Sequence, residues 1–158
     1  MTINAEHVSE IFSVFHDGTI VGQAFDGSLL DLEVEIIYLA VRVNPNFRSF
    51  RLRLLNTRDI RFKVWPNDVN AEPYEILSVP QIFQPELEIL RGKSDGDAVK
   101  VICSQVSKGF DYCGGELSLR ASSAVVTDES GIEYSICDLK KLSEEYWADW
   151  ERRNAVAK

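Results

Sequence analysis

Three segments in the first half of the chain alternate between apolar and charged residues. The charged positions are acidic in the first segment and basic in the next two: Asp31, Glu33 and Glu35, then Arg51 and Arg53, then Arg61 and Lys63. A period of two is typical of a strand with one face in the core and the other in water. We therefore expect a sheet whose wet face is acidic on one strand and basic on the next two.

Turn signals divide the rest of the strand pattern. Asp26-Gly27 predicts a hairpin between strands at 19–25 and 29–43, and Asn56-Thr57-Arg58 predicts another between 47–55 and 59–65. The alternation slips near residues 36–37, which favours a bulge or burial on both faces. Further strands are expected at 86–90, 98–106, 115–126 and 132–134, with turns at 92–96 and 128–131.

Both ends of the chain show the helical period instead. An apolar stripe predicts a helix over residues 5–15, with Asn4 as its N-cap and Gly18 supplying the positive φ after its end. Near the other end, Ser135 to Asp138 matches a capping box and precedes a second apolar stripe. Residues 154–158 are expected to fray.

This order of elements predicts an α+β fold. Residues 1–158 are expected to form a single domain, in which an N-terminal and a C-terminal helix pack on a largely antiparallel sheet with meander connections. A chain of this size buries a sizeable core. Within the last helix, the spacing of Trp147 and Trp150 leaves one tryptophan partly exposed.

Charge narrows the possible partners. The chain carries 17 Lys and Arg against 25 Asp and Glu, a net charge of −8. We therefore expect no nucleic-acid binding through the overall electrostatic field of the protein.

Residues 42–63 nevertheless hold seven basic side chains against Asp59 alone. If the predicted hairpin closes tightly, Arg53 faces Arg61 and Arg51 faces Lys63. Either the neighbouring acidic strand offsets this repulsion, or the cluster docks an acidic partner.

The cysteines and the apolar runs point to a cytoplasmic location. Three cysteines without a CxxC pair are typical of reduced thiols. No signal-peptide pattern is present, and the longest apolar run, residues 36–41, is too short for a membrane. Two histidines without paired ligands predict no metal, and no glycine pattern predicts a cofactor.

Two side-chain groups are candidates for catalysis. His16 beside Asp17 could act as a general base, and Cys113 before two glycines could act as a nucleophile. Adjacent residues at a helix end more often satisfy loose backbone groups, and a cysteine before glycines more often packs at a bulge. Since no catalytic motif accompanies them, we expect a protein that is not an enzyme.

Several short segments together resemble a family. They are FHDG at 15–18, YLA at 38–40, residues 62–65, GELSL at 115–119 and YW at 146–147. The set resembles small uncharacterised bacterial proteins with an N-terminal FHDG motif, some of which look like immunity proteins of polymorphic toxin systems. The resemblance implies a cytosolic protein that neutralises a toxin by binding it, and it transfers no catalytic residue.

The function expected from the sequence is therefore binding to a protein partner. An acidic protein suits a basic, toxin-like partner. The candidate contact residues are Asp31, Glu33, Glu35, Arg51, Arg53, Arg61, Lys63, Glu144, Glu145 and Asp149. The alternative is a small-molecule binding module with a pocket under the sheet near Trp65. The oligomeric state stays open.

Overall fold

The computed structural model describes residues 5–105 and 107–156. The helices are α1 (Ala5–Val14), α2 (Ile37–Val43), α3 (Val79–Ile82) and α4 (Ile136–Val156). The strands are β1 (Thr19–Asp26), β2 (Leu29–Glu35), β3 (Ser49–Leu55), β4 (Arg58–Pro66), β5 (Tyr74–Ile76), β6 (Leu87–Asp95), β7 (Ala98–Gln105), β8 (Tyr112–Arg120), β9 (Ser123–Thr127) and β10 (Glu133–Tyr134).

The strands of the described residues join one antiparallel sheet in the order β10-β9-β3-β2-β1-β6-β7-β8-β4-β5. The predicted α+β class, with a largely antiparallel sheet and a helix near each end, is confirmed. The β1–β2 hairpin turns at Gly27, whose φ of 62° fits the predicted Asp-Gly turn. β6 continues to Asp95 and β7 begins at Ala98, so the turn expected over residues 92–96 is formed by Gly96 and Asp97.

The predicted hairpin between residues 47–55 and 59–65 is wrong. β3 pairs with β2 and β9, whereas β4 pairs with β8 and β5. Asn56 and Asp59 have positive φ values of 51° and 55°, and the Thr57 amide donates to the Ser28 carbonyl at 2.7 Å. The chain therefore crosses from one half of the sheet to the other, and Arg53 does not face Arg61.

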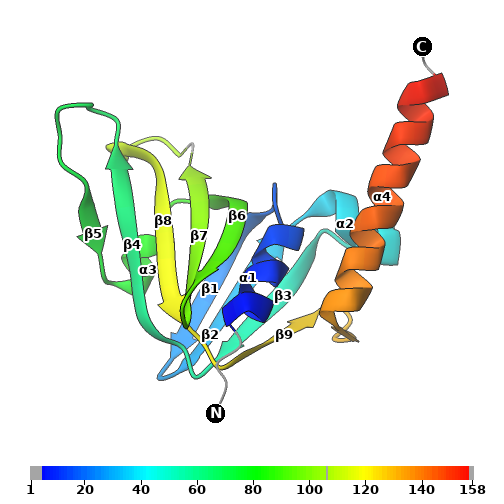
Figure 1. Ribbon diagram of the computed structural model, residues 1–158, viewed down its shortest axis with the longest axis horizontal. Helices are drawn as coiled ribbons and strands as arrows, with labels where there is room; N and C mark the ends of the chain where they lie inside the picture. Colours follow the sequence, from blue (N-terminus) through cyan, green and yellow to red (C-terminus); the bar gives the residue numbers. More distant parts are fainter. Residues whose placement is uncertain (1–4, 106, 157–158) are drawn as a thin grey trace.

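β8 and β9 make the same crossing beside β3 and β4. The strand expected over residues 115–126 is divided there, and the Ser122 amide donates to the Leu55 carbonyl at 2.9 Å. The pairing of Arg58 with Arg120 continues into that of Leu55 with Ser123. The two crossing segments thus form a bent ribbon from which the halves of the sheet diverge (Figure 1).

The strand predicted to reach Val43 ends at Glu35, and α2 follows it. Within α2, Leu39 and Ala40 are buried while Ile37 and Val41 are exposed, which is a helical period rather than a strand period. The slip in alternation at residues 36–37 is therefore a change of element and not a bulge.

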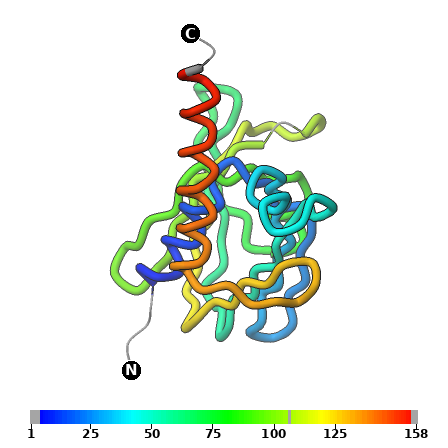
Figure 2. The backbone as a smooth tube through the Cα atoms, turned by 90° about the vertical axis from the view of Figure 1, so that its right-hand side faces the viewer, coloured from blue at the N-terminus to red at the C-terminus, as the bar shows by residue number. Residues whose placement is uncertain are grey.

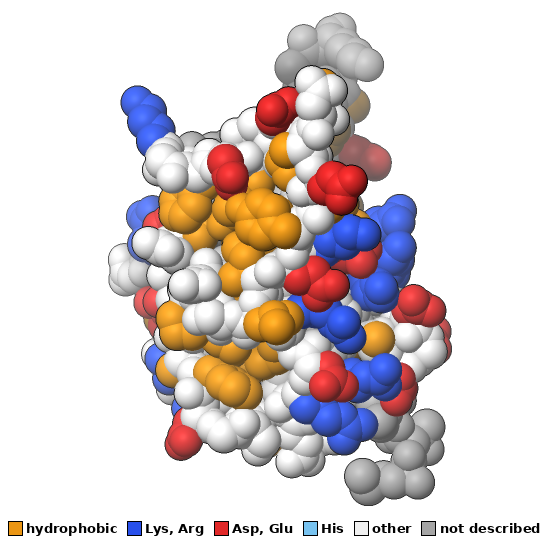
Figure 3. Space-filling model, turned by 90° about the vertical axis from the view of Figure 1, so that its left-hand side faces the viewer, with side chains coloured by type: hydrophobic (Ala, Val, Ile, Leu, Met, Phe, Trp, Pro, Cys, Tyr) orange, Lys and Arg blue, Asp and Glu red, His pale blue; other side chains and the backbone are white. Residues whose placement is uncertain are grey.

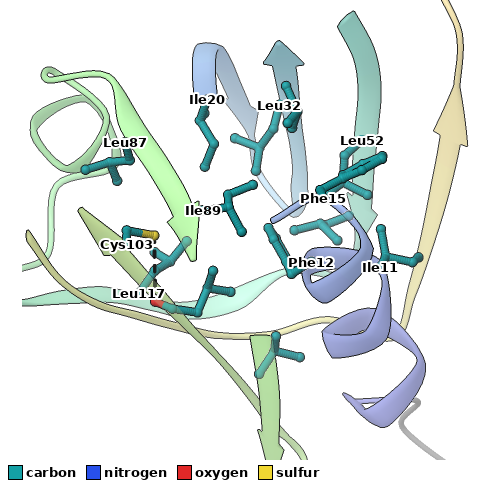
Figure 4. Close-up of a cluster of buried hydrophobic side chains, with 14 of the residues drawn as sticks. Ile11, Phe12, Phe15, Ile20, Leu32, Leu52, Leu87, Ile89, Cys103 and Leu117 are labelled. Atoms are coloured by element: carbon teal, nitrogen blue, oxygen red, sulfur yellow. Dashed lines mark hydrogen bonds between the residues drawn. The ribbon is translucent and has the colours of Figure 1, made fainter. Parts of the chain in front are cut away.

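α1 lies in the hollow of the curled sheet and contacts β6, β7, β9 and α4 (Figure 1). The predicted apolar stripe is buried, with Val8, Ile11 and Phe12 on α1 and Phe15 just after it. Figure 4 shows Ile11, Phe12 and Phe15 among the inner side chains of the strands. At the crossing with β6, a Cβ on Gly92 would lie 2.5 Å from the Ser9 carbonyl oxygen. Only glycine allows this close packing. The predicted cap, Asn4, lies outside the described residues.

The turn after α1 differs in one detail from its prediction. The left-handed residue is Asp17, with a φ of 68°, and not Gly18. Gly18 is needed for space, because a Cβ there would lie 2.9 Å from both the Phe15 carbonyl oxygen and Val34. Aspartate tolerates the left-handed region better than most residues with a side chain.

α4 begins with the predicted capping box. The Ser135 amide donates to the Asp138 carboxylate at 3.0 Å, and the Asp138 amide donates to the Ser135 hydroxyl at 3.1 Å. The helix continues through Val156, so residues 154–156 are helical and not a frayed tail. Its last turns extend beyond the body of the molecule (Figures 1 and 2).

Candidate binding surface

Five aromatic side chains from three separate elements meet beside α4. His16 comes from the turn after α1, Tyr38 from α2, and Tyr146, Trp147 and Trp150 from α4. We call these five residues the aromatic cluster. The Trp147 ring lies 4.9 Å from that of Tyr146, 6.0 Å from that of His16 and 6.0 Å from that of Trp150. The Tyr38 ring lies 4.6 Å from that of Tyr146.

Backbone hydrogen bonds fix the His16 turn on the sheet. The Asp17 amide donates to the Ile89 carbonyl at 2.7 Å, and the Ile89 amide donates to the Gly18 carbonyl at 2.8 Å. The Tyr38 hydroxyl donates to the His16 carbonyl at 3.0 Å. Burial raises the pKa of Tyr38 above its ordinary value, and the negative charge of Asp17 raises it further. The phenol therefore stays a hydrogen-bond donor at neutral pH.

Ion pairs hold α4 against the other helices. Arg42 of α2 pairs with Asp149 and lies over the Tyr146 ring, 5.8 Å from its centroid. Asp149 also pairs with Arg152. Lys140 pairs with Glu10 of α1 at 2.7 Å. The cluster therefore sits on a support that is tied to both α1 and α2.

The outer part of the cluster is open to solvent. Trp147 is 37% exposed and Trp150 is 45% exposed. Both tryptophans are therefore accessible to solvent, whereas the sequence predicted that one of them would be. Glu144 and Glu151 lie three residues before and four residues after Trp147, which places them on its flank of the helix. Neither glutamate forms an ion pair within the described residues. Asp17 adds a carboxylate beside His16.

The predicted acidic and basic strands lie side by side. Asp31 is in register with Arg53, and Glu33 with Arg51. Arg51 and Arg53 each reach Asp31 at 3.4 Å, and Arg48 lies 3.8 Å from Glu35. The explanation in which the acidic strand offsets the arginines is thus confirmed for β3.

Arg61 and Lys63 lie apart from these residues, on the other half of the sheet. Arg61 pairs with Glu75 at 3.8 Å, and Lys63 is in register with Glu116. Charged residues of both signs surround a cleft of about 390 Å³ there. Figure 3 shows this half with acidic and basic side chains mixed in one band and hydrophobic side chains gathered beside it.

The three predicted acids of α4 have different surroundings. Glu144 is exposed on the flank of Trp147. Glu145 borders a shallow cavity near Ile132 and Leu142. Asp149 pairs with Arg152 within α4 and with Arg42 of α2, and the second pair links α4 to α2.

The residues considered for catalysis do not come together. The His16 ring lies against Trp147 and Tyr38, with its Nδ1 3.3 Å from an Asp17 carboxylate oxygen. Cys113 is exposed on β8, with its sulfur 3.9 Å from the Trp65 carbonyl oxygen. In the sheet, β6 and β7 separate β8 from β1. The geometry therefore offers no His16–Cys113 pair.

Trp65 does not reach the space under the sheet. It is 39% exposed on the outer face, while its neighbour Val64 is buried with Phe62 and Ile82. These three side chains belong to the hydrophobic core on the inner side of the sheet.

Sequence reasoning does not identify the aromatic cluster. The alternation places Tyr38 in a strand, which gives no reason to expect its approach to α4. The family resemblance is a sequence signal that points to the cluster. Its FHDG, YLA and YW segments contain four of the five members: His16, Tyr38, Tyr146 and Trp147.

None of the helices in the described part of the chain combines the length and apolar character that a membrane crossing requires. Across residues 5–105 and 107–156, no three His, Cys, Asp or Glu side chains gather as a metal-ligand set. In comparisons with known proteins, the chain matches no family model, no curated protein and no solved structure.

Proposed function

We propose that this protein acts by contact, binding a basic partner protein through the aromatic cluster and its flanking acids. The observation that carries the proposal is the pair of exposed tryptophans, Trp147 and Trp150, on a support built from three elements. The kind of function proposed is that of an immunity protein, which neutralises its partner by occupying it.

The aromatic residues supply the binding energy in this proposal. Tryptophan and tyrosine are enriched among the few residues that dominate protein interfaces, because they bury large areas at small entropic cost. Trp147 is stacked on Tyr146 and His16, so its orientation is set before a partner arrives. Pre-organisation of this kind lowers the cost of association.

The acids favour a positively charged partner. Glu144 and Glu151 flank Trp147 on α4, and Asp17 lies beside His16. None of these three acids forms an ion pair with Lys or Arg of the described chain. Carboxylates beside aromatic faces suit arginine and lysine side chains, which gain from both ion pairing and cation–π contact. The net charge of −8 adds long-range attraction for a basic protein.

That the partner is a toxin rests on the sequence resemblance. Three of its segments supply members of the aromatic cluster, so the same residues support both parts of the proposal.

The test is capture of a partner from the native lysate by tagged protein, with identification by mass spectrometry. We expect one stoichiometric partner that is basic, is lost on Trp150→Ala and is weakened at high salt. Trp65→Ala is the matched control, because Trp65 is 39% exposed against 45% for Trp150 but lies on the outer face of β4. Equal capture by all three proteins, or empty capture, would contradict the proposal.

A further inference from the structure

A polar cleft of about 360 Å³ opens on the outer face of β2, β3 and β9, and its lining includes no residue of the aromatic cluster. These three strands lie side by side in the sheet (Figure 1). Charged walls are supplied by Glu33, Arg51, Arg53 and Glu129, and Ser49 and Thr127 add small side chains. We call it the outer cleft. Its volume lies within the range of small-molecule sites.

The loop that borders the outer cleft is ordered by a buried carboxylate. Asp128 is 4% exposed and accepts hydrogen bonds from the Ser130 amide and hydroxyl, the Ile132 amide and the Tyr134 hydroxyl. This network fixes the loop between β9 and β10. The wall of the cleft is therefore formed before any ligand arrives.

Two carboxylates at one end of the outer cleft lack a cationic partner in the described chain. One oxygen of Glu129 accepts from the backbone amides of Arg48 and Ser49, the latter at 3.0 Å. The Ser49 hydroxyl donates to Glu33 at 3.1 Å. No Lys or Arg of the described residues forms an ion pair with Glu33 or Glu129. This end is negative.

The other end of the outer cleft is positive. Arg51 and Arg53 both direct their Nε atoms to Asp31, each at 3.4 Å, so two guanidinium groups share one carboxylate. Glu33 and Arg51 are in register, so the direction of their side chains is what separates their charges. The Glu33 carboxylate accepts from Ser49, whereas the Arg51 Nε lies toward Asp31, on the opposite side of this pair. The charges therefore diverge toward the two ends of the cleft.

We propose that the outer cleft binds a small zwitterionic ligand. Its ammonium group lies between Glu33 and Glu129, and its carboxylate lies against Arg51 and Arg53. Arginine recognises a carboxylate through paired N–H donors, and each charge-assisted hydrogen bond is stronger than a neutral one. This site is independent of the partner surface on α4.

The probe for the test is ε-aminocaproate, followed by backbone-amide NMR of Ser49, Thr127 and Glu129. We expect saturable shifts at these amides and an affinity at least about tenfold higher than for hexylamine or for caproate, a difference of about 1.4 kcal/mol. Equal affinity for hexylamine, or shifts that do not saturate below about 10 mM, a very weak affinity, would overturn the proposal.

Substitutions locate the ammonium end. Glu33→Gln and, separately, Glu129→Gln are expected to weaken binding about tenfold, because each removes one carboxylate charge but keeps an acceptor oxygen. The matched control is Glu116→Gln, which alters the cleft on the other half of the sheet. If both cleft variants fold and bind as the wild type does, the assigned site is wrong.

Discussion

Single residues carry the close contacts on which this fold depends. Gly92 lets α1 cross β6, and the Ser13 hydroxyl fastens the crossing by donating to the Gly92 carbonyl at 2.9 Å. Arg53 lies beside Asp31 because β3 pairs with β2 and not with β4. Both contacts can be tested by substitution.

Gly92→Ala is expected to destabilise the protein by about 1–3 kcal/mol, because the added methyl group would press on the Ser9 backbone. Urea unfolding measures the loss. Gly22→Ala is the matched strand control, since a Cβ there would first meet the Glu33 side chain, at 3.3 Å. Equal stability of the two variants would argue against the described crossing of α1 and β6.

Arg53→Glu is expected to cost about 1 kcal/mol in the free energy of unfolding, because it sets a glutamate directly opposite Asp31. Arg58→Glu is the control. Arg58 is in register with Arg120, so its reversal replaces a like-charge pair with an opposite one. If Arg53→Glu were neutral and Arg58→Glu destabilising, the pairing of β3 with β2 would be in doubt.

At the scale of elements, the sequence predicts the helices and strands that are determined by residues close together in the chain. The alternation of Leu52 and Phe62 with basic residues predicts their burial, and both are fully buried. The Ser135–Asp138 pattern predicts the start of α4 because a capping box involves only neighbouring residues. Strand partners could not be predicted in the same way, since β3 finds β9 through contacts far apart in the sequence.

The wrong hairpin prediction and the missed helix α2 both have physical causes. An adjacent-strand hairpin would have put Arg53 against Arg61, and the structure avoids this repulsion by crossing at residues 56–59. The pattern does not reveal α2 because its apolar residues continue those of β2 without a turn residue between them. Since Tyr38 belongs to α2, the same error conceals the aromatic cluster.

The β9–β10 connection predicts a pH dependence of stability. Burial of Asp128 raises its pKa, but hydrogen bonds from Ser130, Tyr134 and Ile132 outweigh burial and hold the pKa below its ordinary value of 3.8. The folded state therefore binds this proton more weakly than the unfolded state does. The stabilisation is present above about pH 4 and is lost as the pH falls through the lowered pKa.

Urea midpoints of the wild type and Asp128→Asn, measured from neutral pH down to about pH 3, test this dependence. The advantage of the wild type should shrink as the pH falls, because the asparagine of the variant has no charge to lose. A difference between the two proteins that is constant across this range would contradict the assigned role of Asp128.

At the scale of the whole molecule, the curled sheet buries its apolar side around α1 and keeps its charged side in water. Much of that outer charge is paired internally, as Asp31 with Arg51 and Arg53 shows. The unpaired acids beside exposed aromatic rings occur at α4, whose end extends from the body (Figure 2). The composition predicts an acidic surface, but only the fold distinguishes paired charge from unpaired charge.

The most direct measurement of the central claim is the affinity of the captured partner for purified variants by titration calorimetry. The account predicts that Trp150→Ala weakens binding at least tenfold, about 1.4 kcal/mol, while Trp65→Ala stays within about twofold. Melting temperatures of both variants near that of the wild type would exclude unfolding as the cause. Unchanged affinity of a folded Trp150→Ala would contradict binding through the aromatic cluster.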